Sequence, residues 1–248
     1  MSDIRCILAD NASPMTLDGT RTYIIGHRQV AVIDPGPNLP AHIDAVAAAI
    51  GDGVAVTVLV THAHPDHSDG AQTLAARFDT APRRVIEGTE IETDAGTLRA
   101  IATPGHTPDH FVFHLPARAA VFCGDMMMGG LDTALVALPE GDLQAYLTSL
   151  EKIRALQCTT IYPAHGEPFT DPDAAIERYV RHRLERVQQV TNALQAGPAR
   201  AEDLVDRIYG RELDPRLRVY AADAVLAYLA YLQNGGMVQH TQNVWSLV

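Results

Sequence analysis

The hydrophobic positions of this chain fall into short runs separated by helix-like segments. Residues 54–60, Val-Ala-Val-Thr-Val-Leu-Val, are apolar and rich in β-branched side chains, which is typical of a buried strand. Before them, residues 21–34 contain two short strand patterns joined by a turn at Gly26 and His27, and residues 40–50 carry good helix formers after a proline. A strand, a helix and a further strand in this order predict an α/β protein.

The same analysis extends to the rest of the chain. Short strands are expected over residues 84–88, 90–93, 97–102, 111–115, 119–123 and 159–162. Helices are expected over residues 70–78, capped by Ser68 or Asp69, and over residues 141–156. After residue 176 the pattern predicts a long helix, then helices over 200–209 and 216–233, and finally a two-stranded hairpin that ends at Val248.

Side chains that bind metals are concentrated directly after the strand at 54–60. Four of them, His62, His64, Asp66 and His67, lie within six residues. Imidazole nitrogen and carboxylate oxygen are ligands that Zn²⁺ accepts. Composition alone would produce H-x-H-x-D-H with a probability of roughly two in a thousand, so the motif indicates a metal site rather than a polar loop that happens to hold histidines.

Further candidates follow other predicted strands. Asp34 ends the strand before the first helix, and His106 and His110 lie in a loop shaped by proline and glycine over 103–110. Asp125 follows Gly124, and His165 follows the strand at 159–162. A sheet whose strands end at a common edge would bring these residues together.

Length and charge limit the classes of protein that fit. A chain of 248 residues with 47% hydrophobic residues fits one large domain, or one domain with a small appendage. The net charge of −11 disfavours a surface built mainly for nucleic-acid phosphates. Residues 1–179 hold 11 basic and 23 acidic side chains, whereas residues 180–248 hold 8 and 7, which supports a boundary near residue 180.

The sequence shows no sorting signal and no disulfide framework. The first ten residues lack the apolar segment of a secretory signal, and no uncharged apolar run of 18 residues follows, so we expect a cytoplasmic protein without a membrane partner. Cys6, Cys123 and Cys158 are too few and too scattered to form a disulfide framework, and we interpret them as small buried hydrophobic residues.

The order and spacing of these motifs resemble the metallo-β-lactamase superfamily over residues 1–175. The resemblance rests on Asp34, H-x-H-x-D-H at 62–67, Gly-His-Thr at 105–107, Gly-Asp at 124–125 and Pro-Ala-His-Gly at 163–166. Residues 140–143, the arginine pattern of 183–190 and the tail are similar to the beta-lactamase-like 2 subgroup, some members of which are endoribonucleases on single-stranded RNA. The resemblance implies an αββα sandwich in a catalytic domain over 1–178 and a winged-helix-like domain over 179–248.

The resemblance also implies which residues bind two metal ions. The first ion would be held by His62, His64 and His106, the second by Asp66, His67 and His165, and Asp125 would bridge them. Two Zn²⁺ ions are expected, with Mn²⁺ or Fe²⁺ as alternatives. Penicillin-hydrolysing members carry Cys where Asp125 stands, and flavo-diiron relatives carry Glu in place of His64, so neither activity is expected.

Residues near these ligands have less specific assignments. We expect Asp34 to accept a hydrogen bond from a ligand imidazole, because ligating histidines usually donate their other N–H to a carboxylate or carbonyl. His110 either contacts substrate or braces its loop, and residues 126–128, all Met, either pack in the core or line a pliable pocket. The remaining histidines are expected to serve structure or lie at the surface: His27, His42, His114, His182 and His240.

Two divalent ions roughly 3.5 to 4 Å apart share a water molecule and lower its pKa toward about 7. The expected activity is therefore hydrolysis of an ester, thioester, amide or phosphodiester by a metal-bridging hydroxide, which Asp66 would orient while it takes up a proton. A small-molecule substrate is favoured over RNA. Small thioesters or lactones need only an apolar pocket, whereas glutathione thioesters are disfavoured because the single lysine, Lys152, lies on an outer helix.

Two alternatives involve nucleic acid. Arg178, Arg181, Arg183 and Arg186 form either a track for single-stranded RNA or a structural seam between domains, paired with nearby glutamates. In the first case, replacing Arg183 and Arg186 would weaken RNA cleavage and its salt dependence. A non-enzymatic nucleic-acid-binding protein would use the tail, but residues 219–233 hold no lysine or arginine, so we expect packing or a lid instead of DNA reading.

Overall fold

Two β-sheets packed face to face form the centre of the computed structural model, which describes residues 3–131 and 133–248. The first sheet has the strand order β1-β2-β3-β4 and the second β5-β6-β7-β8-β9. The strands of the first sheet are β1 (Ile4–Leu8), β2 (Arg21–Ile25), β3 (Gln29–Ile33) and β4 (Ala55–Leu59). Those of the second are β5 (Glu90–Thr93), β6 (Gly96–Ala102), β7 (Phe111–Leu115), β8 (Ala120–Gly124) and β9 (Thr160–Pro163).

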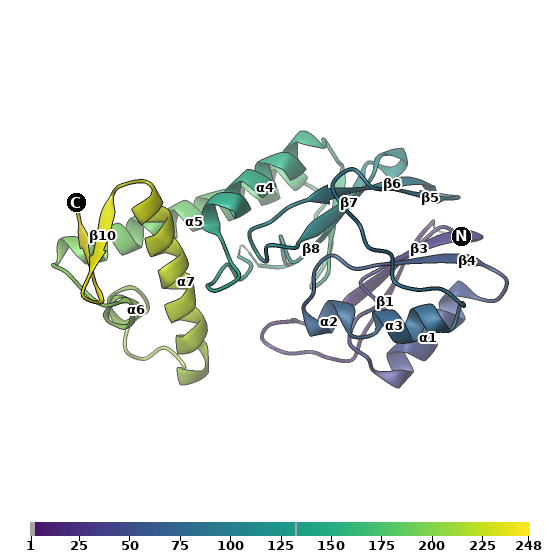
Figure 1. The fold of residues 1–248 in the computed structure, drawn as a ribbon, viewed down its shortest axis with the longest axis horizontal. Helices are drawn as coiled ribbons and strands as arrows, with labels where there is room; N and C mark the ends of the chain where they lie inside the picture. Colours follow the sequence, from purple (N-terminus) through teal and green to yellow (C-terminus); the bar gives the residue numbers. More distant parts are fainter. Residues whose placement is uncertain (1–2, 132) are drawn as a thin grey trace.

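Helices cover the outer faces of both sheets (Figure 1). On the first sheet lie α1 (Pro40–Ile50) and α3 (Ala71–Ala76), with the short α2 (Pro65–Ser68) before α3. On the second lie α4 (Leu143–Ala155) and α5 (Pro172–Gln195), and the single turn η1 (Pro116–Arg118) joins β7 to β8. At the end of the molecule opposite α1 and α3 lie α6 (Ala201–Tyr209), α7 (Pro215–Asn234), β10 (Val238–Thr241) and β11 (Val244–Leu247). The expected αββα sandwich is confirmed.

Apolar burial on both sides of each sheet holds these layers together. Ile33 and Leu59 point between the sheets, where they share a buried cluster with Phe113. Val32 and Val58 point to the opposite side, into the cluster under α1 and α3, because successive strand residues face opposite sides. Burial on both faces explains why β4 appears in the sequence as an unbroken apolar run.

Two parallel strand pairs bring the ends of four strands to one edge. β3 pairs in parallel with β4 after α1, and β8 pairs in parallel with β9 after α4. The segments that follow these strands are therefore neighbours at their carboxyl ends. They carry Asp34, residues 61–67, Asp125 and His165.

Two local predictions were wrong, and one strand was missed. Residues 84–88 form no strand: Arg83 N–H donates to Val58 O, but Ile86 is 69% exposed, so its apolar side chain finds no sheet to pack on. The cap expected from Ser68 or Asp69 is absent, since Ser68 ends α2 and α3 begins after Gly70 without a side-chain cap. Strand β1 was not predicted, because its residues are only half-buried and its apolar alternation is weak.

The interpretation of the cysteines holds only for Cys123, which is buried. Cys6 is exposed on β1, which lies at the edge of the first sheet, and Cys158 is intermediate. An edge strand leaves alternate side chains open to solvent, which the sequence alone does not indicate.

Beyond residue 170 the expected helices and the terminal hairpin are present. Helix α5 begins at its cap Asp171, whose side chain accepts from Ala174 N–H, and runs without interruption through residues 178 and 179. One apolar cluster joins α4, α5, α6 and α7. The division at 178/179 and the winged-helix character of the tail remain predictions. In the part of the chain that is described, no helix is long and apolar enough to cross a membrane.

The cluster between the sheets gives a first testable prediction. Phe113→Ala removes a side chain with 0% exposure, so we expect the free energy of unfolding to fall by about 3 to 5 kcal/mol in denaturant titrations. Ile86→Ala, at an exposed apolar position, should change it by less than about 0.5 kcal/mol. Equal effects of the two substitutions would contradict this account of the core.

Candidate metal centre

The seven side chains predicted as metal ligands converge at the carboxyl ends of β3, β4, β8 and β9. They form two groups, each with one donor atom per residue and with all donors within 4.8 Å of one another. The first group contains His62, His64, His106 and Asp125, and the second contains Asp66, His67 and His165.

The first group directs three imidazole nitrogens at one small volume. His64 Nδ1 lies 2.9 Å from His62 Nε2 and 3.2 Å from His106 Nε2, and Asp125 Oδ2 lies 3.7 Å from His106 Nε2. With metal–nitrogen bonds of about 2.0 to 2.1 Å, the donors around a tetrahedral zinc ion lie about 3.3 Å apart. The observed spacings therefore fit one cation.

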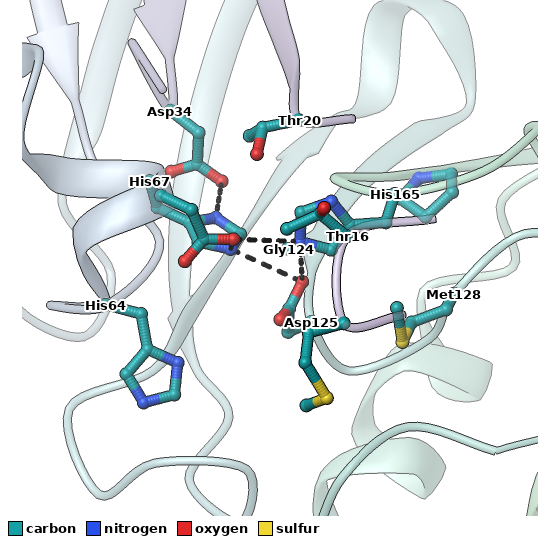
Figure 2. A network of polar contacts seen from close by, with 12 residues as sticks. Thr16, Thr20, Asp34, His64, His67, Gly124, Asp125, Met128 and His165 are labelled. Carbon is teal, nitrogen blue, oxygen red and sulfur yellow. Dashed lines mark hydrogen bonds and ion pairs between the residues drawn. The ribbon is translucent and has the colours of Figure 1, made fainter. Parts of the chain in front are cut away.

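The second group has similar spacing and shares Asp125 with the first. Asp66 Oδ2 lies 3.4 Å from His67 Nε2 and 3.2 Å from His165 Nε2. The other oxygen of Asp125, Oδ1, lies 3.5 Å from His67 Nε2 and 3.3 Å from His165 Nε2. Asp125 thus presents one oxygen to each group, as Figure 2 shows for the side of His67 and His165.

A protein partner holds the opposite nitrogen of each ring. His106 Nδ1–H donates to Leu135 O at 2.7 Å and His165 Nδ1–H donates to Gly19 O at 3.1 Å. His62 Nδ1 lies 3.0 Å from Thr61 Oγ1, and His64 Nε2 lies 2.9 Å from a carboxylate oxygen of Glu140. A proton on the outer nitrogen leaves the inner nitrogen with a free lone pair, which is the tautomer a metal needs.

Asp34 fixes His67 in the same way. Its Oδ2 lies 2.9 Å from His67 Nδ1 and accepts from Thr61 Oγ1–H at 2.8 Å, while Oδ1 accepts from Thr61 N–H at 2.7 Å. Asp34 adopts φ 51°, a left-handed conformation that Asp tolerates better than most residues. The contact to a ligand imidazole that the sequence led us to expect is present, and it is buried.

The orphaned atoms of the site test whether a cation fits. Three buried donor atoms, His67 Nε2, His165 Nε2 and Asp125 Oδ1, have no hydrogen-bond partner among the described residues. Buried polar atoms are rarely left unsatisfied, and these three point at one another. A cation between them satisfies all three, so the residues present fit a metal ion.

Charge leads to the same conclusion. Burial lowers the pKa of His67, but the carboxylates of Asp125 and Asp34 outweigh burial and raise it well above its ordinary value. Burial likewise opposes ionisation of Asp125, yet His67 and His165 hold the pKa of its carboxyl well below its usual range. The site therefore favours positive charge beside an ionised Asp125, which is where a divalent ion would lie.

His110 braces the loop before Asp125. It is 1% exposed, its Nδ1 lies 3.0 Å from Thr103 Oγ1, and its Nε2 accepts from Asp125 N–H at 3.3 Å. Burial, followed by the neighbouring His106, lowers its pKa well below the ordinary value, so Nε2 stays available as an acceptor. Of the two expected roles, these contacts favour the bracing one.

Four partners of the ligand rings were not assigned from the sequence. Glu140 lies in the motif at 140–143, which carried a resemblance but no role, and Thr61 lies beside the histidine motif. The other two are main-chain carbonyls, Leu135 O and Gly19 O, which no residue type signals. Only the fold brings these carbonyls to the rings.

The three consecutive methionines and the histidines outside the site lie in the core, beside a cavity or near the surface. Met126 and Met127 are fully buried in the core, whereas Met128 also lines a cavity. His42 is buried against Thr22 Oγ1, and His240 stacks on Trp245. His27 and His114 are partly exposed, and His182 lines the same cavity as Met128.

Comparisons with known proteins agree with the fold and the site. The model of the metallo-beta-lactamase superfamily matches residues 15–97 and 82–165. The beta-lactamase-like protein 2 homolog of Caenorhabditis elegans is 30% identical over an alignment of 257 residues. The alignment covers 94% of this chain and 85% of the relative. The chain belongs to the metallo-β-lactamase superfamily and is a metal-dependent hydrolase.

Two further relatives extend the comparison. An atrochrysone carboxyl ACP thioesterase of Aspergillus chevalieri is 32% identical over 227 residues, covering 82% of this chain and 72% of the relative. The crystal structure of a beta-lactamase domain protein from Burkholderia ambifaria matches with a TM-score of 0.84 and 22% identity, covering 100% of this chain and 93% of that one. The second likeness extends the shared fold to the C-terminal helices.

The Asp34 contact gives the second prediction. In Asp34→Asn an amide N–H₂ would face His67 Nδ1–H, so the ring would move its proton to Nε2, the nitrogen that faces Asp66 and Asp125. We expect metal affinity to fall about 10- to 100-fold when measured by competition with a chelator. Asp52→Asn, at an exposed loop position, is the matched control, and equal affinities in both variants would rule out this role of Asp34.

Proposed function

We propose that this protein is a dinuclear zinc hydrolase that cleaves a thioester or ester with an apolar acyl chain. The observation that carries the proposal is Asp125, whose two oxygens face two separate groups of ligand atoms. In this proposal His62, His64 and His106 bind one ion, Asp66, His67 and His165 bind the other, and Asp125 bridges them. A donor set made only of histidine nitrogens and aspartate oxygens favours zinc, with Mn²⁺ or Fe²⁺ as alternatives.

When bound, two such ions supply Lewis acidity that polarises the scissile carbonyl and acidifies a water molecule. The protein residues orient the reactants and accept the proton. Burial opposes ionisation of Asp66, but the neighbouring imidazoles of His165 and His67 hold its pKa below the ordinary value, so the carboxyl group is ionised. Its side chain is 28% exposed, which gives water a path to it.

The surroundings of the site favour an apolar acyl group. A cavity next to the His106 loop is lined mainly by apolar side chains, among them Met15, Met128, Leu135, Leu213 and Leu217. Leu135 joins the cavity to the metal centre, because its carbonyl holds His106. A relative whose name describes a thioesterase supports the same substrate class.

The arginines of α5 give little support to the RNA alternative. Arg183 is only 3% exposed. Arg181 Nε lies 3.9 Å from Glu185 Oε1. The guanidinium of Arg186 lies over the ring of Tyr209 and donates to Gln189 Oε1. They do not form one exposed track. A non-enzymatic nucleic-acid-binding role is disfavoured by the complete ligand set.

Metal analysis provides the third prediction. Protein purified without added metal should contain close to two zinc ions per chain, since the donors fall into two groups. Asp125→Ala should lower both the metal content and the rate, because it removes a donor from each group. Asp52→Ala serves as the control. A metal-free preparation with full activity, or an Asp125→Ala variant that keeps both ions, would contradict the proposal.

Substrate screening provides the fourth prediction. A panel of ester, thioester, lactone and single-stranded RNA substrates should show turnover of thioesters or esters. His62→Ala should lower that turnover by at least about a hundredfold, since Lewis-acid stabilisation is worth several kcal/mol. RNA cleavage without ester or thioester turnover would replace this proposal by the endoribonuclease alternative.

A further inference from the structure

The cavity beside the metal centre contains a second chemical feature besides its apolar wall. Its volume is about 310 Å³, and it is lined by residues within 128–131, 133–135, α5 and α7. Apolar residues with substantial exposure stand around it, including Met15, Leu131, Leu217 and Tyr220. Two arginines of α5, Arg183 and Arg186, also line it.

Arg183 is a buried cation whose hydrogen-bond donors are only partly satisfied. Its Nη1 donates to Tyr228 Oη at 2.7 Å, and its guanidinium carbon lies 5.4 Å from the centre of the Tyr146 ring. Its Nε and Nη2 have no hydrogen-bond partner among the described residues, although the side chain is 3% exposed. Within residues 3–131 and 133–248 it makes no ion pair with a carboxylate.

A side chain in this state needs an anion. Arginine does not lose its proton in proteins, so it cannot adapt to burial by becoming neutral. Buried charges are normally paired, and a phenol and a ring face replace only part of the hydration that Arg183 gives up. The two unsatisfied atoms, Nε and Nη2, form the edge of the guanidinium that binds a carboxylate or phosphate in bidentate fashion.

The cavity is positioned to hold a substrate of the metal centre. Met128 follows the bridging candidate Asp125 by three residues, and Figure 2 draws both side chains in the network of the site. Leu135, also in the cavity wall, accepts from His106 Nδ1–H. A molecule in the cavity therefore contacts Met128 and Leu135, which adjoin the candidate metal ligands, and has Arg183 in its wall.

We propose that this cavity binds the organic part of the substrate and that Arg183, assisted by Arg186, binds an anionic group on it. The inference rests on the proposed hydrolase function and narrows it to an acyl thioester or ester that carries a carboxylate or a phosphate. Two sources supply such a group: an acid group on the acyl chain, or a phosphate on the thiol leaving group. An apolar chain without a charge leaves Nε and Nη2 unpaired.

Four thioesters distinguish these sources. Hexanoyl and adipoyl thioesters of N-acetylcysteamine differ only by a terminal carboxylate on the acyl chain. Hexanoyl thioesters of pantetheine and of 4′-phosphopantetheine differ only by a phosphate on the leaving group. We expect the metal-loaded enzyme to prefer the charged member of one pair by about 10- to 100-fold in kcat/KM, the range of a charge-assisted hydrogen bond. Preference ratios near one in both pairs would overturn the inference.

Variants on α5 locate the effect. Arg183→Met keeps the length of the side chain without its charge and should reduce the preferred ratio at least about tenfold. Arg181→Gln removes an exposed charge from the same helix and should leave the ratio unchanged. An equal ratio in wild type and Arg183→Met would overturn the inference. If Arg183→Met does not fold, Arg183→Lys is used in its place. Because lysine lacks the guanidinium edge, the kcat/KM preference for the charged thioester should fall at least about threefold. An unchanged preference overturns the inference.

A binding measurement separates this inference from the hydrolase proposal. Adipate and hexanoate are titrated calorimetrically into wild type, Arg183→Met and Arg181→Gln, all metal-loaded. Weaker adipate binding in Arg183→Met alone supports the inference even if no thioester is turned over, in which case only the proposed function fails. Equal adipate binding in all three proteins places the carboxylates on the metals and overturns the inference.

Discussion

The placement of Asp125 is the constraint on which the rest of this structure depends. The carboxylate of Asp125 is buried among imidazoles, with one oxygen turned toward His106 and the other toward His67 and His165. In a protein interior such a charge is stable only beside compensating positive charge. The strand ends, the bracing His110 and the carbonyls behind the rings all keep these donor atoms aimed at the same two volumes.

Holding the rings requires contributions from distant parts of the chain. Gly19 lies in the loop before β2, Asp34 after β3, Leu135 in the long segment before α4, and Glu140 two residues before the cap of that helix. Each partner fixes one nitrogen of one histidine, so the tautomers are set before any metal arrives. The same segment that carries Leu135 also forms a wall of the cavity, so it contacts both the candidate metal site and the cavity.

The C-terminal helices contribute to this cavity. α5 and α7 meet through Arg183 and Tyr228, and both helices share an apolar cluster with α4. The burial of Arg183, between α5 and α7, favours the structural-seam role over the RNA-track role that were both considered for the arginines of α5. It also gives the cavity a fixed positive charge in an otherwise acidic protein.

The sequence by itself determined the strand-helix-strand order and the compact motif at 62–67, because local periodicity and residue spacing survive in a one-dimensional pattern. The αββα class and the assignment of seven ligands followed from the resemblance of its motifs to the metallo-β-lactamase superfamily. The sequence misjudged residues 84–88 and Cys6, because the exposure of an apolar residue depends on which strand lies beside it. The sequence could not identify Leu135 O and Gly19 O as partners of the histidine rings, and it could not show that Arg183 is buried with unpaired donors. Only tertiary structure decided these, since main-chain carbonyls look alike in any sequence and the burial of a charge depends on residues far along the chain.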